Sequence, residues 1–171
     1  MSMTISAIAA VDNQMAIGKE NKIPWYAPAD LAFFKQKTLN QHILMGYKTY
    51  LSLPKLLPQR EHIVLTRKNS RDLPQRANLN FVNTWEEVLH LCDEQQAQQL
   101  WVIGGEQIYA QLLPFCHYLQ LSRIDTRVEN PDAFFPPIPA HFELIETEFK
   151  AAEGKNLYNI SFDTYKNTQI I

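Results

Sequence analysis

An acidic residue close to two aromatic residues is the strongest catalytic signal in the sequence. Asp30 lies two residues after Pro28, and two phenylalanines follow it three and four positions later. Pro24 and Pro28 each fix φ and disfavour helix in the preceding residue, so an extended segment is predicted before a helix that begins near Pro28. Asp30 then lies in the first helical turn, with the rings on or beside its face. Such a carboxyl can be a tuned functional acid, and a solvated first-turn Asp is the ordinary alternative.

The segment before this helix is long enough to act as a lid. Residues 13–25 contain Gly18 and end in the pair Pro24-Trp25. Closing loops exclude water from a reaction and complete a site. We therefore expect a site between this segment and the Asp30 helix.

Glycines mark a second candidate site. Gly46 and the pair Gly104-Gly105 follow predicted strands, where α/β sheets bind ligands and helix N-termini favour phosphates. Thr49 could add a hydroxyl and Lys48 a charge. Neither segment matches Gly-x-Gly-x-x-Gly or a phosphate loop, so a simple turn after the strand is the alternative at the glycine pair.

Short apolar runs alternate with helical patterns along most of the chain. The runs occupy residues 5–11, 43–45, 63–65, 79–82, 100–103 and 118–124, with helical periodicity in 85–92 and 108–113. Strands that alternate with helices indicate a parallel sheet. Residues 142–151 and 157–165 instead alternate apolar and polar side chains around the turn 153–156, which predicts a hairpin. The predicted fold is α/β: a single-domain mixed, mostly parallel central sheet flanked by helices, with a C-terminal antiparallel hairpin.

Composition limits the classes of partner. The 171 residues carry a net charge of −2 with 46% hydrophobic residues, so one soluble domain, 1–171, is expected, with no nucleic-acid or membrane partner. The proline-rich residues 126–140 are predicted to be an irregular loop. No apolar run approaches the length of about 18 residues that a membrane-spanning helix needs, and no signal peptide is found, which favours the cytoplasm. The two cysteines are expected to be reduced structural thiols, and the scattered histidines predict no metal site.

Taken in order, these motifs resemble the dihydrofolate reductase family, of the bacterial chromosomal type. Residues 17–35 are similar to its mobile loop, Pro-Trp pair and acid followed by Phe. Residues 45–49 resemble its Met-Gly-Arg-x-Thr motif, residues 57–60 its Leu-Pro-x-Arg and residues 103–105 its Ile-Gly-Gly. The resemblance implies that NADPH reduces 7,8-dihydrofolate to 5,6,7,8-tetrahydrofolate, with hydride transfer to pterin C6 and protonation of N5. It also implies a monomer of one-carbon metabolism that binds antifolate-like molecules.

The resemblance further assigns site residues. It implies catalytic roles for Asp30, Trp25 and Ser122, and substrate contacts by Ile8, Ala10, Asp30, Leu31, Phe34, Lys35, Leu53, Leu57, Arg60 and Ser122. It implies cofactor contacts by Ala10, Ile17, Gly46, Tyr47, Lys48, Thr49, Leu65, Thr66, Arg67, Ile103, Gly104, Gly105, Glu106, Gln107, Ile108 and Tyr109, with an adenosine-binding subdomain at roughly residues 41–92 and a cis Gly104-Gly105 peptide.

The chain departs from the family pattern at three of these positions. Tyr47 stands where the family usually has Arg, which puts one phosphate contact in doubt. Ser122 replaces the usual Thr and keeps the hydroxyl that would bond Asp30. Glu106 stands where a third glycine is common.

Two other functions remain open. One is a related NADPH-dependent pyrimidine reductase of riboflavin synthesis, and the other is a non-catalytic pterin or nucleotide-binding module. Asp30 followed by Phe34, together with Arg60, argues against the pyrimidine reductase, because its substrate has no carboxylate tail to grip.

Overall fold

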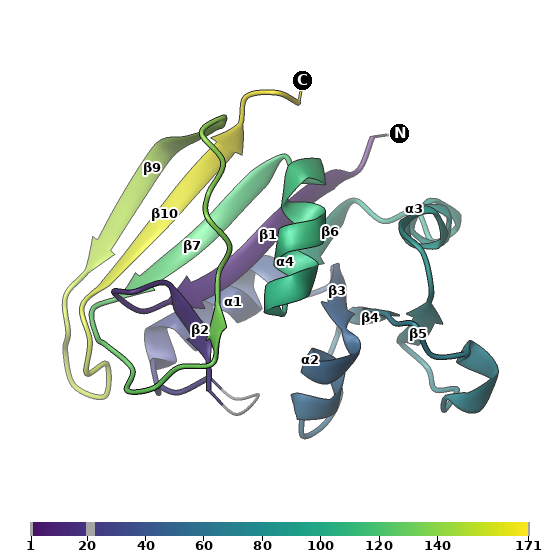
Figure 1. The fold of residues 1–171 in the computed structure, drawn as a ribbon, viewed down its shortest axis with the longest axis horizontal. Helices are drawn as coiled ribbons and strands as arrows, with labels where there is room; N and C mark the ends of the chain where they lie inside the picture. Colours follow the sequence, from purple (N-terminus) through teal and green to yellow (C-terminus); the bar gives the residue numbers. More distant parts are fainter. Residues whose placement is uncertain (1, 20–22, 171) are drawn as a thin grey trace.

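The computed structural model describes residues 2–19 and 23–170, and within these residues it is built on an eight-stranded sheet (Figure 1). The sheet has the order β5-β4-β3-β6-β1-β7-β10-β9, and β2 pairs separately with β8. The strands are β1 (Thr4–Val11), β2 (Ala16–Gly18), β3 (His42–Gly46), β4 (Glu61–Leu65), β5 (Leu79–Val82), β6 (Gln99–Val102), β7 (Tyr118–Ile124), β8 (Ala133–Phe134), β9 (Phe142–Lys150) and β10 (Ile160–Asn167). The α-helices are α1 (Pro28–Thr38), α2 (Tyr47–Ser52), α3 (Trp85–Glu94) and α4 (Glu106–Leu112), and the 3₁₀ turns are η1 (Ser70–Asp72) and η2 (Leu113–Phe115).

The central strand is β1, as its apolar residues on both faces predict. It pairs in parallel with β6 on one side and β7 on the other, and most of its side chains are buried. A strand covered on both faces reads as a continuous apolar run. Figure 1 shows α4 in front of the sheet and α1 behind it. The predicted α/β fold with a mostly parallel sheet is therefore confirmed.

The C-terminal hairpin closes the sheet in the antiparallel sense. β10 pairs with β7 and β9, and its turn contains a bridge between Glu153 and Asn156. Gly154 in this turn has φ of 58°, a conformation that glycine adopts readily. The hairpin is confirmed, but its second strand begins at Ile160 and not at residue 157, because the Ala152 N–H donates to the Asn159 side chain at 2.8 Å and not to a strand carbonyl.

The loop predicted to be irregular contains one short strand. Ala133 and Phe134 form β8, which pairs antiparallel with β2. The buried Asp12 carboxylate supports the same region, because it accepts the backbone N–H groups of Gln14, Ala16 and Val128 at 2.8–2.9 Å. The prediction of a wholly irregular loop was wrong because the strand is too short to carry an alternating pattern.

Helix α1 is held from outside by the hairpin. Its N-cap residue, Ala27, makes no side-chain cap bond. Asn156 of the hairpin turn accepts the Ala29 N–H at 2.7 Å, and the ring of Phe33 lies 4.5 Å from that of Phe162 on β10. A helix N-terminus leaves N–H groups without intrahelical partners, so this contact fixes the turn that carries the candidate acid.

The described residues also bear on membrane spans, metal sites and the state of the cysteines. In residues 2–19 and 23–170 no helix is long and apolar enough to cross a membrane, and no cluster of His, Cys, Asp or Glu is arranged to hold a metal ion. Both cysteines are free and buried, and burial raises the pKa of Cys92 to about 11. Thiols of this kind behave as small apolar side chains, as predicted.

Candidate active site

Asp30 lies in the first turn of α1, half-buried against the sheet. Burial raises the pKa of its carboxyl above the ordinary value near 3.8, and a hydrogen bond with Ser122 acts in the opposite direction. Ser122 is buried on β7, opposite Ala10 of β1. No Lys or Arg in the described parts of the chain forms an ion pair with Asp30. The acid is therefore desolvated and held by one hydroxyl, which is the environment of a tuned carboxyl.

Trp25 lies on the hairpin side of this acid. Its side chain is 9% exposed and belongs to a buried cluster with Ile124 and Phe162, against which Ala10 and Phe33 also pack. The predicted lid, residues 13–25, is described except for residues 20–22, which lie outside the described residues. Ile17, on β2, is partly buried against the main core.

A second apolar wall lies on the other side. The partly buried side chains of Phe34, Leu53, Leu57 and Ile103 pack against the buried cluster that contains Ile8. Two other predicted contacts of the substrate are open to solvent, since Leu31 is 52% exposed and Lys35 is also exposed. The structure thus brings together the predicted apolar contacts and leaves these two at the surface.

Arg60 is buried, contrary to the ordinary alternative of a solvated surface charge. Its side chain is 7% exposed, Nε donates to the Pro58 carbonyl at 2.9 Å, and Nη1 donates to the Thr38 hydroxyl at 3.2 Å. Burial lowers the pKa of the guanidinium from its ordinary value. It forms no ion pair within residues 2–19 and 23–170. A buried cation with a fixed fork and no counterion suits a ligand carboxylate.

The predicted glycines meet at adjacent strand ends. The Gly46 N–H donates to the Gly104 carbonyl at 2.9 Å, and the Gly104-Gly105 peptide is cis, as predicted. A Cβ on Gly46 would lie 2.9 Å from Cγ1 of Ile108, and one on Gly105 would lie 3.5 Å from the Thr49 hydroxyl. Gly104 has φ of +120°, a conformation that favours glycine. Glycine is therefore required at Gly46 and Gly104 by close packing of the Ile108 and Tyr109 side chains against the backbone, which brings the ends of β3 and β6 together.

Tyr109 links the glycine region to the acid. Its hydroxyl donates to the Ile8 carbonyl at 2.7 Å, and burial, followed by the Asp30 charge, raises its pKa. The neighbouring residues of α4 differ: Gln107 is exposed, and the exposed Glu106 carboxylate accepts the Phe134 N–H of β8 at 2.8 Å. Glu106 thus ties the glycine segment to the loop that pairs with β2.

A basic turn follows β4. After the half-buried Leu65, Thr66 is buried and its hydroxyl accepts the Lys68 N–H at 3.1 Å, while Arg67 is exposed. The ammonium of Lys68 lies 5.2 Å from the ring centre of Tyr47, a cation–π contact. Lys48 is exposed on α2. Two lysines are therefore next to Tyr47, the residue that replaces the family arginine: Lys68 contacts its ring, and Lys48 follows it in the sequence.

Sequence reasoning missed three residues that hold this site. Asn156 caps α1, Asn83 donates to the carbonyls of Thr66 and Lys68 at 2.7 and 2.9 Å, and His62 bonds the backbone of the Leu57 segment. In each case a side chain forms a hydrogen bond with a backbone group of another segment, which the local sequence does not reveal. For Asn83 and Asn156 the only local signal was a turn-forming residue type.

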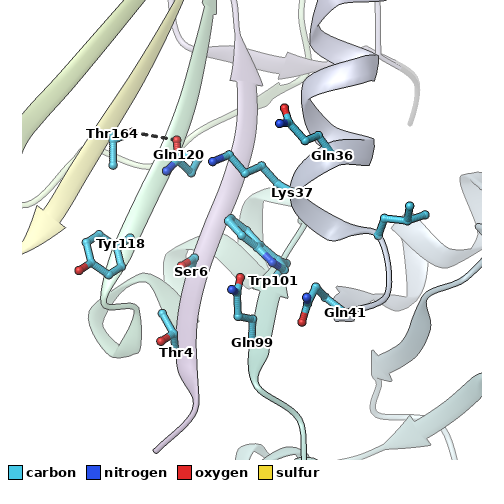
Figure 2. A pocket seen from close by; sticks show the side chains of 11 residues that line it. Thr4, Ser6, Gln36, Lys37, Gln41, Gln99, Trp101, Tyr118, Gln120 and Thr164 are labelled. Carbon is cyan, nitrogen blue, oxygen red and sulfur yellow. Dashed lines mark hydrogen bonds between the residues drawn. The ribbon is translucent and has the colours of Figure 1, made fainter.

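A cavity of about 470 Å³ lies away from these residues, beneath the C-terminal half of α1. Figure 2 shows Gln36 and Lys37 of α1 over Ser6, Gln99 and Trp101 of the sheet. The cavity is open and mostly polar, and it contains none of the predicted site residues. We therefore place the candidate site at Asp30, Phe34 and Arg60, which do not line this cavity.

Comparisons with known proteins agree with one another. A family model described as dihydrofolate reductase matches residues 4–167. A dihydrofolate reductase of Buchnera aphidicola is 36% identical over 167 residues, covering 94% of this chain and 98% of its own. One from Bacillus subtilis is 34% identical over 163 residues, covering 95% and 94%. The solved dihydrofolate reductase from Enterococcus faecalis, complexed with NADP(H) and RAB-propyl, is 34% identical with a TM-score of 0.84 over 95% of both chains.

Proposed function

Because the chain belongs to the dihydrofolate reductase family, we propose that it reduces 7,8-dihydrofolate to 5,6,7,8-tetrahydrofolate with NADPH, and that Asp30 is the carboxyl that supports the reaction. The observation that carries the residue assignment is the half-buried Asp30 with a Ser122 hydroxyl and no cationic partner among the described residues. NADPH supplies the hydride that goes to pterin C6. The chain's own residues bind, orient and exclude water.

Asp30 holds the N–C–N edge of the pterin ring. As an anion beside that edge it raises the basicity of N5, so that a proton carried by water reaches N5 when C6 is reduced. Ser122 keeps the carboxylate oriented, and the buried Trp25, the last residue of the lid, packs against Ile124 and Phe162 of the sheet. Ile8, Ala10 and Phe34 form the walls around the ring.

The folate tail runs along the apolar side of the site toward Arg60. Leu31, Leu53 and Leu57 contact its aromatic part, and the exposed Lys35 adds a cation at the mouth. The Arg60 fork takes the α-carboxylate of the tail, and its bonds to Pro58 and Thr38 keep it in place. Charge-assisted, two-point hydrogen bonds give this contact both strength and direction.

The cofactor contacts follow the glycine region and the basic turn. The backbone of Gly46, Gly104 and Gly105 at the ends of β3 and β6 approaches the cofactor's phosphates, and the Thr49 hydroxyl lies beside Gly105. The list of contacts is completed by Ala10, Ile17, Tyr47, Lys48, Leu65, Thr66, Arg67, Ile103, Glu106, Gln107, Ile108 and Tyr109. Residues of the subdomain at roughly 41–92 hold the adenosine, within a single domain that spans residues 1–171.

Arg67 is the principal group for the 2′-phosphate. It is exposed after β4, where its guanidinium can take two phosphate oxygens. The cation–π contact of Lys68 with Tyr47 keeps a further cation beside this turn. Tyr47 itself gives no charge, so the phosphate grip is weaker than in members that keep the arginine.

The test is consumption of NADPH, followed by near-ultraviolet absorbance, after addition of 7,8-dihydrofolate to the purified chain. Reduction of dihydrofolate with NADPH supports the proposal. Consumption with the aminopyrimidine substrate of riboflavin synthesis and none with dihydrofolate would favour the related reductase, and binding without consumption would favour a silent module. Size-exclusion chromatography tests the proposed monomer, and cell fractionation tests the proposed cytoplasmic location.

A further inference from the structure

His62 is a fully buried titratable side chain that the proposed chemistry does not use. It lies on β4 two residues after Arg60, and its side chain is 0% exposed. Its neighbours in the sheet are Ile43 of β3 and Leu79 of β5. Polar side chains are rarely buried to this degree without a structural or functional task.

The ring of His62 is fixed in one protonation state by its contacts. The Leu57 N–H donates to Nε2 at 3.0 Å, and a backbone N–H can only donate. Nε2 must therefore be unprotonated. Nδ1 lies 3.1 Å from the carbonyl oxygens of Arg60 and Asn78, which can only accept, so Nδ1 carries the proton. The ring is neutral and both nitrogens are used.

These contacts join the two ends of the segment that carries Arg60. Nε2 holds the backbone of Leu57, and Nδ1 holds the backbone of Arg60. The Arg60 side chain then turns back to the Pro58 carbonyl and across to Thr38 of α1. The imidazole therefore sets the shape of residues 57–60 and, through it, the direction of the guanidinium.

We propose that His62 is a positioning residue, which orients the Leu57–Arg60 segment for the carboxylate tail of the substrate. The proposal rests on the function proposed above. It predicts that the neutral ring is needed for tail binding and that the pterin and the cofactor do not depend on it. It also predicts that protonation of Nε2 releases the Leu57 N–H and weakens tail binding in acid.

The surroundings of the ring favour the neutral form. Burial lowers the pKa of His62 from its ordinary value of 6.5, the carbonyls of Arg60 and Asn78 raise it, the Arg60 charge lowers it and the Glu61 charge raises it. The sheet neighbours Ile43 and Leu79 are uncharged. Glu61 is itself engaged, since it accepts from the Asn80 amide at 2.8 Å.

The first test compares His62→Leu, which removes all three ring contacts, with His62→Gln, whose amide can accept from Leu57 and donate to a carbonyl without titrating. His42→Gln is the matched control, because His42 lies on the adjacent β3 and its ring bonds the side chain of Gln95, the residue that follows α3. The substrates are dihydrofolate and a dihydropterin that lacks the tail. We expect His62→Leu to raise the KM for dihydrofolate about tenfold, the effect of one net hydrogen bond. The KM for the dihydropterin and for NADPH should stay unchanged, His62→Gln should recover most of the loss, and His42→Gln should match the wild type.

The outcomes separate this proposal from the proposed function. An enzyme that reduces neither substrate contradicts the function. If the wild type reduces both substrates, the function stands. In that case, a His62→Leu variant that loses equally with the two substrates, or loses nothing, contradicts only the role of His62.

The second test uses the unaltered chain and does not depend on a variant that folds. Long-range ¹H–¹⁵N correlation spectra report which ring nitrogen carries the proton. The proposal requires the Nδ1-protonated neutral form of His62 at neutral pH. A proton on Nε2, or a cationic ring at that pH, would overturn it.

Discussion

Replacement of Arg60 by leucine is the sharpest single perturbation of the substrate site. Arg60 is 7% exposed, and its bonds to Pro58 and Thr38 hold the fork in one place. A tail carboxylate would gain one or two charge-assisted hydrogen bonds at about 1.5–3 kcal/mol each. Screening by solvent lowers the sum of these gains. We therefore expect Arg60→Leu to weaken dihydrofolate by roughly 2–4 kcal/mol, which is about 30-fold to 700-fold in Kd.

The assay is titration of dihydrofolate, a tail-lacking dihydropterin and NADPH into each variant. Arg60→Lys should fall between the wild type and Arg60→Leu, because it keeps the charge and loses the two-point geometry. The exposed Arg76→Leu is the matched control and should bind all three ligands as the wild type does. Equal weakening of NADPH and dihydrofolate in Arg60→Leu would refute the tail contact and indicate damage to the fold.

Three further results are expected. Arg67→Ala should lower NADPH affinity by roughly 1.5–3 kcal/mol with little change for NADH, whereas equal losses for both cofactors in titrations would mean that Arg67 does not bind the 2′-phosphate. Tyr47→Arg should tighten NADPH, and salt titration should show a larger gain at low ionic strength, since the added contact is partly exposed; a gain independent of salt would contradict that reading. Asp12→Asn should lower the free energy of unfolding by about 1–3 kcal/mol at neutral pH in urea titrations, beside an Asp93→Asn control, because the carboxylate accepts three backbone N–H groups. Burial raises the pKa of the Asp12 carboxyl, but the hydrogen bonds together lower it by more, so its net pKa lies below 3.8. The stability that this carboxylate contributes is therefore complete above that pH and is lost as the pH falls through the folded-state pKa. A loss that persists unchanged in strong acid would contradict this.

The strands were the most predictable part of the fold. Residues 79–82 and 118–124 were predicted with the bounds that the structure has, since their apolar runs end at turn-forming residues. The two-residue β8 was not predicted, because two residues give no periodicity. The start of β10 was placed three residues early for a different reason: Leu157 is apolar, but its side chain is exposed in the short segment between the turn and the strand.

The sequence predicted which residues form the site, but not the contacts that hold them in place. Asp30, Gly46 and Arg60 follow from local motifs and the family resemblance. The burial of Arg60 does not, because it depends on Thr38 of α1, which is 22 residues away. The same holds for His62, since a histidine in an apolar strand gives no sign of which backbone groups its ring will meet.

The central claim is that Asp30 supports protonation of the substrate, and the pH dependence of Asp30→Asn tests it most directly. An amide can hold the pterin edge but cannot raise N5 basicity as an anion does. We expect Asp30→Asn to fold and bind NADPH normally, to lose activity with dihydrofolate by about a hundredfold or more at neutral pH, and to regain part of it in acid, where the substrate arrives protonated. A variant with a flat pH profile and near-normal activity would contradict the account.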